Sequence, residues 1–205
     1  MSILGKIFSK KPSKEPITPD FISLLSKCVI DDDKRDEVKK IIEKCWVPNK
    51  ARYERVADLT GVPSWVIFCI HYKEASCSFA GVLHNGDRII GTGKLTIQVP
   101  KGRGPFKTWE ESATDALLLK KNIFPKNWLV VPDCLEFCEK YNGLGHRRHG
   151  ELSPYIWAYT NQHDETGNYV SDGKYNPEAP IKSPGVAALM ITLVEMGEAG
   201  LRKKQ

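Results

Sequence analysis

The segment Pro63-Ser64-Trp65-Val66-Ile67-Phe68-Cys69-Ile70-His71-Tyr72-Lys73-Glu74 decides the fold. Pro63 suits the first turn of a helix, where its missing N–H group has no hydrogen bond to lose. The apolar side chains that follow would lie on nearly every side of such a helix rather than along one stripe. We therefore predict a helix over residues 63–74 that is buried at the centre of the molecule.

This apolar helix ends in a carboxylate, Glu74. The C-terminal end of a helix carries partial negative charge, so an ionised Glu74 is disfavoured there, and burial disfavours it further. The pKa of Glu74 is therefore expected to rise. That is a poor arrangement for a structural carboxylate and a useful one for an acid that must stay protonated near neutral pH. The alternative is a salt bridge at the end of the helix.

Further helices are predicted on both sides of this segment from apolar residues at helical spacing. Gly61 closes one of them, and Thr108 with Glu111 has the form of a capping box that opens another. The predicted helices cover residues 21–28, 36–47, 50–60, 108–121, 132–141 and 184–196.

A small hairpin is predicted directly after the Glu74 helix. Asn85-Gly86 is a strong turn signal, and Ile89-Ile90 and Leu95–Val99 have the character of strands. Residues 146–180 are rich in His, Pro, Gly, Tyr and Asn, and we expect them to be largely loop. The fold class that follows is mainly α (α+β), with one small antiparallel hairpin after the helix that carries Glu74.

The chain has 205 residues, which is the length of one domain, or of one domain with a small appendage. Residues 1–20 contain three prolines and four lysines, and we interpret them as a flexible basic leader. Residues 21–200 are interpreted as one catalytic domain, in which residues 21–60 form a helical N-terminal extension.

Charge and hydropathy exclude several classes of protein. There are 30 Lys and Arg residues against 25 Asp and Glu residues, and the resulting net charge of +5 favours an anionic partner. Nucleic acid is not expected to be that partner, because no nucleic-acid-binding motif is present. No stretch approaches the roughly 18–20 apolar residues of a membrane span, so stable membrane insertion is not expected. Since no Sec signal peptide is recognisable, we expect synthesis in the cytoplasm.

The six cysteines are expected to be reduced and partly buried, because a chain of this length does not need disulfides to be stable. Cys69, His71 and Cys77 do not have a recognised metal-ligand spacing, so neither a metal nor an organic cofactor is predicted. A Cys/His hydrolase that uses these three residues remains a rival interpretation.

Several strings in order resemble the lysozyme-like superfamily, and more closely the bacterial and phage lysozyme-type peptidoglycan hydrolases, including endolysins. They span about residues 60–195 and are Ile70-His71-Tyr72-Lys73-Glu74-Ala75-Ser76, Leu83-His84-Asn85-Gly86-Asp87, Val99-Pro100-Lys101-Gly102-Arg103, Thr108-Trp109-Glu110-Glu111-Ser112-Ala113, Tyr141-Asn142-Gly143-Leu144-Gly145, Ser153-Pro154-Tyr155-Ile156-Trp157 and Tyr169-Val170-Ser171-Asp172-Gly173-Lys174-Tyr175.

The resemblance implies a lysozyme-like helical domain that cleaves the glycan backbone of N-acetylmuramic acid (MurNAc) and N-acetylglucosamine (GlcNAc). Glu74 would be the general acid. Asp87, with Thr96 rather than Thr92, would hold a nucleophilic water for an inverting hydrolysis. If neither Asp87 nor Thr96 reaches the site, the N-acetyl group or the 6-hydroxyl group of the sugar would act instead, the latter making the protein a lytic transglycosylase.

Sugar rings pack on aromatic side chains, and N-acetyl groups bond to amides, so further residues are candidates for substrate binding. Arg103 is expected to meet a carboxylate of the muramyl unit or its peptide. The candidates are Tyr72, His84, Asn85, Arg103, Tyr141, Asn142, Tyr155 and Trp157.

The expected partner is the glycan strand of peptidoglycan, and the expected place of action is the cell wall, which is reached through the host periplasm if the protein is a phage endolysin. A non-catalytic peptidoglycan-binding or phage structural protein with the same fold is the other alternative. The presence of Glu74 argues against it, because loss of that acid is the simplest route to inactivity.

Overall fold

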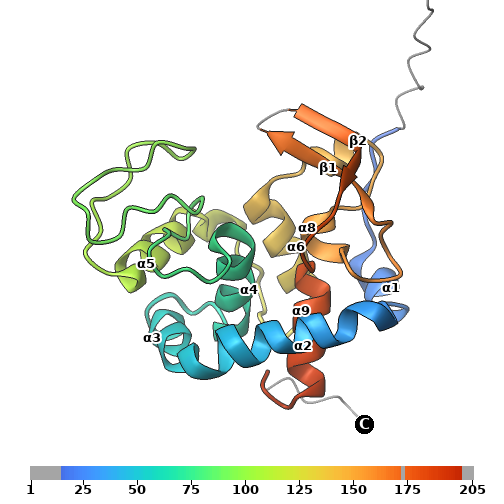
Figure 1. Ribbon diagram of the computed structural model, residues 1–205, viewed down its shortest axis with the longest axis horizontal. Helices are drawn as coiled ribbons and strands as arrows, with labels where there is room; N and C mark the ends of the chain where they lie inside the picture. Colours follow the sequence, from blue (N-terminus) through green and yellow to red (C-terminus); the bar gives the residue numbers. More distant parts are fainter. Residues whose placement is uncertain (1–14, 172–173, 200–205) are drawn as a thin grey trace, which may run out of the picture.

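A buried helix, α4 (Ser64–Ala75), lies at the centre of the molecule, as the sequence predicts (Figure 1). In this computed structural model, which describes residues 15–171 and 174–199, every side chain of α4 from Trp65 to His71 is buried. Three other helices pack against α4, namely α3 (Lys50–Thr60), α6 (Val131–Asn142) and α9 (Val186–Glu195). The mainly α fold class is confirmed.

The remaining elements are short. They are α1 (Phe21–Ser26), α2 (Arg35–Ile41) with a π-helical turn (Ile42–Trp46), α5 (Trp109–Leu119), α7 (Gly145–Arg148), α8 (Pro154–Trp157), β1 (Thr166–Ser171), β2 (Lys174–Pro180) and three 3₁₀ turns at Asp32–Lys34, Val47–Asn49 and Lys121–Ile123. No helix within residues 15–171 and 174–199 has the length and apolar character needed to cross a bilayer. The leader predicted for residues 1–20 lies outside the described residues as far as residue 14.

The helix ends follow the local sequence signals. Gly61 caps α3 with φ of 73°, a left-handed conformation that favours glycine. The Thr108 side chain accepts the backbone N–H of Glu111, and Glu111 bonds back to Thr108, so the predicted capping box that opens α5 is confirmed.

The first three helices share one hydrophobic core with α4. Tyr53 of α3 lies within 6.0 Å, between ring centroids, of Trp46, Phe68, His71 and Trp109. The Tyr53 hydroxyl donates to Nδ1 of His71 at 3.1 Å, because Nε2 of the same ring donates to the carbonyl of Ser78 at 3.2 Å. Residues 21–60 therefore form part of the same packed unit as the helix that carries Glu74.

The hairpin predicted after α4 is wrong. Residues 83–107 contain no strand and form an irregular loop (Figure 1). Side chains bond to the backbone groups that a ladder would use: the Asp87 carboxylate accepts the N–H groups of Ile97 and Gln98, and Thr96 Oγ1 accepts that of Arg103. The base of the loop is closed by a hydrogen bond from Gly91 N to Phe106 O at 2.9 Å.

The antiparallel pair of strands lies instead within residues 146–180, which we predicted to be largely loop. β1 and β2 pair around Tyr169 and Tyr175, with irregular register on both sides of this pair. Figure 1 shows this sheet near α6 and α8, on the opposite side of α4 from the 83–107 loop and α5. The C-terminal end of α4, with Glu74, therefore lies between two differently built halves of the molecule.

Candidate active site

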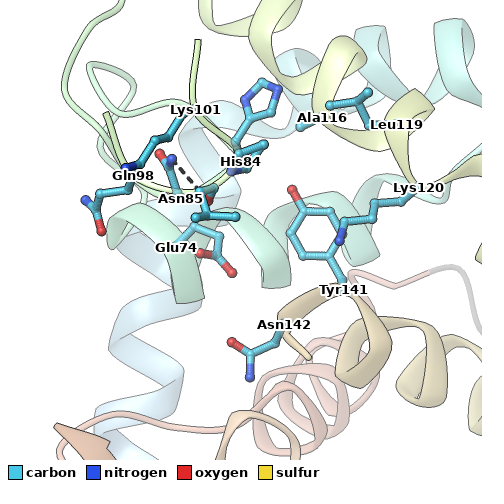
Figure 2. Close-up of a pocket in the computed structure, with 12 residues that line it drawn as sticks. Glu74, His84, Asn85, Gln98, Lys101, Ala116, Leu119, Lys120, Tyr141 and Asn142 are labelled. Carbon is cyan, nitrogen blue, oxygen red and sulfur yellow. Dashed lines mark hydrogen bonds between the residues drawn. The ribbon is translucent and has the colours of Figure 1, made fainter. Parts of the chain in front are cut away.

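A cleft of about 600 Å³ opens at the C-terminal end of α4. Its walls come from the 83–107 loop and from the ends of α5 and α6, and its size is that of a small-molecule or saccharide site. Figure 2 shows the Glu74 carboxyl group between two sets of side chains, with Asn85, Gln98 and Lys101 on one side and Tyr141 and Asn142 on the other.

Glu74 is the only acidic residue among the described residues that line this cleft. Its Oε1 accepts a hydrogen bond from the hydroxyl of Tyr155 at 3.0 Å. Burial raises the pKa of Glu74 to about 7, while the Tyr155 hydrogen bond and the ammonium groups of Lys73 and Lys120 oppose the rise. The sequence expectation of a raised pKa agrees with this value.

The turn after α4 fixes the position of Glu74. Ser76 has φ of 48° and its N–H bonds to the carbonyl of Tyr72, which ends the helix. The loop then returns so closely that a Cβ atom added at Gly86 would lie 2.2 Å from the backbone oxygen of Glu74. The Asn-Gly turn predicted from the sequence thus packs directly against the residue that carries the candidate acid.

Asp87 and Thr96, which were predicted to be catalytic, are not among the residues that line the cleft. Both oxygens of Asp87 are occupied: Oδ2 accepts the backbone N–H groups of Ile97 and Gln98, and Oδ1 accepts Nε2 of Gln98. Although burial opposes ionisation of Asp87, the hydrogen bonds from Gln98 and Ile97 lower its pKa. Thr96 is 4% exposed, and its hydroxyl donates to Pro100 O at 2.5 Å. Both side chains hold the loop in shape.

Arg103 is also placed differently from its prediction as a carboxylate-binding residue. Its guanidinium forms a two-point ion pair with Asp115 of α5, in which Nε lies 3.0 Å from Oδ2. The same carboxylate accepts Nε2 of His84 at 2.8 Å. The ring of His84 stacks on Phe106 and forms part of the cleft wall. Asp115 therefore joins the loop to α5, and Arg103 is not free for substrate.

Two predicted aromatic contacts lie outside the cleft. Trp157 is 0% exposed and packs on Phe21, with ring centroids 5.7 Å apart, so it belongs to the core. Tyr72 is partly buried on α4 and packs against the core rather than lining the cleft. Residue type alone does not distinguish an aromatic side chain of the core from one that contacts a sugar, because both environments favour aromatic rings.

Other predicted residues do meet around Glu74. Tyr141 lines the cleft and donates to the carbonyl of Leu83 at 2.9 Å, and Asn142 beside it is exposed. Asn85 lines the opposite wall, where its Nδ2 contacts Val99 O at 3.4 Å. Tyr155 does not line the cleft itself, but its hydroxyl donates to Glu74. These four residues come from three separate segments, which the fold brings to one carboxyl group.

Sequence reasoning missed Gln98, Lys101 and Lys120, which line the cleft. The ammonium of Lys120 lies 5.5 Å from the ring centroid of Tyr141 and follows the end of α5. Lys101 belongs to the string Val99-Pro100-Lys101-Gly102-Arg103 and Gln98 directly precedes it, so this string was the one available signal. The sequence instead predicts a strand over Leu95–Val99.

Two of the three residues of the rival Cys/His site, Cys69 and His71, are held in the core. Cys69 is fully buried, and burial raises its pKa. Both nitrogens of His71 are hydrogen-bonded, and burial lowers its pKa to about 4. Within the part of the chain that the structure describes, no three His, Cys, Asp or Glu side chains form a group that could hold a metal ion.

No protein-family model matches the chain, and neither the search of curated proteins nor that of solved structures finds a match. The lysozyme-like architecture therefore stays a prediction, and the chemistry of the cleft rests on its own geometry.

Proposed function

We propose that this protein cleaves the MurNAc–GlcNAc backbone of peptidoglycan, with Glu74 as the general acid. The observation that carries the proposal is one carboxyl group with a pKa of about 7, at the end of a buried helix and open to a saccharide-sized cleft. Cleavage of a glycosidic bond needs such a group, because the leaving oxygen must receive a proton as the bond breaks. The sequence resemblance to peptidoglycan hydrolases supports the choice of substrate.

The absence of a second acid from the described cleft lining favours a lytic transglycosylase over an inverting hydrolase. An inverting hydrolase needs a second carboxylate to activate water, and Asp87 is occupied in holding the loop. In the favoured course, Glu74 gives its proton to the leaving oxygen as the C1–O bond breaks. The 6-hydroxyl oxygen of the same sugar attacks C1, and its proton passes to the Glu74 carboxylate. Glu74 is thereby restored and no water is consumed.

Digestion of purified peptidoglycan, with products identified by mass spectrometry, tests both levels of this proposal. Products with 1,6-anhydro ends, lighter by one water than hydrolysis products, would support the lytic transglycosylase. Reducing ends would support a hydrolase and point to a water held by side chains such as Gln98 or Asn85. If intact protein binds peptidoglycan and releases no products, the non-catalytic alternative is correct.

Activity is expected to fall as pH rises above about 7. Glu74 must be protonated to act, so kcat/KM should be level on the acid side and then fall about tenfold per pH unit on the alkaline side. Tyr155→Phe removes a hydrogen bond that lowers the pKa of Glu74, so the alkaline limb should move to higher pH. A pH–rate profile of both proteins measures this. An alkaline limb that stays in place or moves to lower pH in the variant would contradict it.

Two substitutions at Asp87 separate loop support from catalysis. In Asp87→Asn, the remaining carbonyl oxygen can take the two backbone N–H groups, and a rotated Gln98 amide can accept the new NH₂ group. We therefore expect activity within a few-fold of wild type. Asp87→Ala leaves these donors without partners, and the free energy of unfolding should fall by about 1–3 kcal/mol. Chemical denaturation and peptidoglycan turnover measure both effects. Equal loss of turnover in both variants, with folding intact, would instead make Asp87 a catalytic base.

A further inference from the structure

A second, smaller pocket of about 240 Å³ adjoins the cleft on the other side of Glu74. Asn142 lines both spaces, and Tyr155, which lines the smaller one, donates its hydroxyl to Glu74. A substrate strand that places its scissile bond at Glu74 would therefore pass from one space into the other. We call the smaller space the lysine pocket, after Lys73 and Lys182 in its lining.

The lysine pocket is positively charged. Lys73 and Lys182 line it, and no acidic residue does so among those that the structure describes. His146 also lines it, but burial lowers the pKa of this imidazole to about 4, so it adds no charge near neutral pH. The ammonium of Lys73 donates to Ser183 Oγ at 3.2 Å and to Pro184 O at 3.1 Å, which fixes its position. Both partners are uncharged, and within residues 15–171 and 174–199 neither lysine forms an ion pair with a carboxylate. The charge is therefore positioned without being neutralised.

The environment of Lys73 favours a negatively charged ligand. Burial lowers its pKa to about 8, against the opposing effect of Glu74. An ammonium held in a partly buried site without an ionic partner is disfavoured, and an anion that enters the pocket removes part of this cost. The pocket has a volume of about 240 Å³, which is enough for an acidic side group and well below the roughly 600 Å³ of the cleft beside it.

We propose that the lysine pocket binds a carboxylate carried by the muramyl unit next to the scissile bond. This rests on the proposed function, and it names the chemical group of the glycan that the enzyme recognises. The muramyl unit carries a lactyl ether that ends in a carboxyl group, either free or joined to a peptide that has carboxylates of its own. Lys73 and Lys182 would thus bind the carboxylate that the sequence analysis assigned to Arg103. The guanidinium of Arg103 is instead paired with Asp115.

The test compares matched glycan strands. One peptide-free strand carries free lactyl carboxylates, and an otherwise identical strand has these groups reduced to alcohols. Wild type should have a kcat/KM about tenfold higher on the acidic strand, which is the effect of one hydrogen-bonded charge. In Lys73→Gln/Lys182→Gln this preference should fall to near one. Lys126→Gln removes an exposed lysine that lines neither space, and its preference should stay at the wild-type value.

A third strand with intact peptides identifies the source of the carboxylate. If the lactyl group itself is bound, this strand should behave like the reduced one, because its lactyl carboxyl is an amide. If a peptide carboxylate is bound, the lysine-dependent preference should appear on this strand instead. A preference that survives in the double variant, or is absent from wild type on both acidic strands, overturns the proposal.

A binding measurement separates failure of this inference from failure of the proposed function. NMR titration of wild type and the double variant with N-acetylmuramic acid and with N-acetylglucosamine requires no bond cleavage. Lysine-dependent tighter binding of the acid would support the pocket even if no strand is cleaved. Equal affinity of wild type for the two sugars would exclude the lactyl carboxylate as the bound group, and together with no lysine-dependent preference for the strand with intact peptides it would overturn the proposal even if peptidoglycan is degraded.

Discussion

Glu74→Gln is expected to lower the turnover of peptidoglycan by about 10²- to 10⁴-fold, the range that a positioned general acid contributes. The amide keeps the size of the side chain and can still accept the Tyr155 hydroxyl, but it has no proton to give to the leaving oxygen. Because Glu74 is the one acid among the described cleft residues, no neighbour can replace it. Release of soluble glycan fragments, followed over several hours, measures the loss.

Glu74→Gln should lower activity without lowering the stability of the fold at alkaline pH. A stability measurement therefore excludes unfolding as the cause of lost activity. The pKa of Glu74 is raised from 4.5 to about 7 on folding, so the folded state holds this proton more tightly than the unfolded state does. The contribution of Glu74 to stability is therefore complete below pH 4.5 and is lost as pH rises to about 7. At pH 8, Glu74→Gln should be at least as stable as wild type in thermal unfolding, since it buries no ionised group.

An acid outside the site provides the control. Glu54 is exposed on α3, and Glu54→Gln makes the same change of charge away from the cleft. Its turnover should equal that of wild type. If Glu74→Gln and Glu54→Gln were equally active, Glu74 would not be the general acid, and the proposed mechanism would be wrong.

The sequence was sufficient to predict the longer helices, but not the short helices α7 and α8, which lie in or at the edge of the segment expected to be largely loop. Apolar residues on all sides of 64–70 could only be accommodated by a central helix, and Gly61 and Thr108 marked helix ends by local chemistry that needs no tertiary partner. Glu74 was predictable for the same reason, because the position of a carboxylate on a buried helix follows from the helix itself.

The loop that completes the cleft was not predictable in this way. Its shape depends on hydrogen bonds between residues far apart in the chain, such as the pair between Arg103 and Asp115, which no local pattern reveals. Alternating apolar residues at Leu95, Ile97 and Val99 suggested a strand, yet all three are exposed and Asp87 bonds to the backbone between them. Asp87 and Thr96 thus have the residue types of catalytic groups while serving to support the loop.

Gly86→Ala is expected to lower both the stability and the turnover of the protein. Gly86 has φ of 77°, where an L-residue costs about 1–2 kcal/mol, and the added methyl would lie 2.2 Å from the carbonyl oxygen of Glu74. Either the turn or the end of α4 must move, which adds about 1–3 kcal/mol of overpacking. Because the displaced backbone carries the general acid, turnover should also fall by about 10²-fold, the effect of a shift of about 1 Å in a catalytic group.

Gly93→Ala separates backbone strain from displacement of Glu74. Gly93 has φ of 75°, nearly the same as Gly86, but nothing lies within 4 Å of a Cβ atom added there. This variant should lose only about 1–2 kcal/mol, with turnover close to wild type. Denaturation midpoints and peptidoglycan turnover, measured for both variants at a temperature where both are folded, give the comparison. Similar losses of turnover at Gly86 and Gly93 would mean that strain in the loop, rather than contact with α4, controls activity. A larger loss at Gly86 alone would show that the Asn-Gly turn sets the position of the acid.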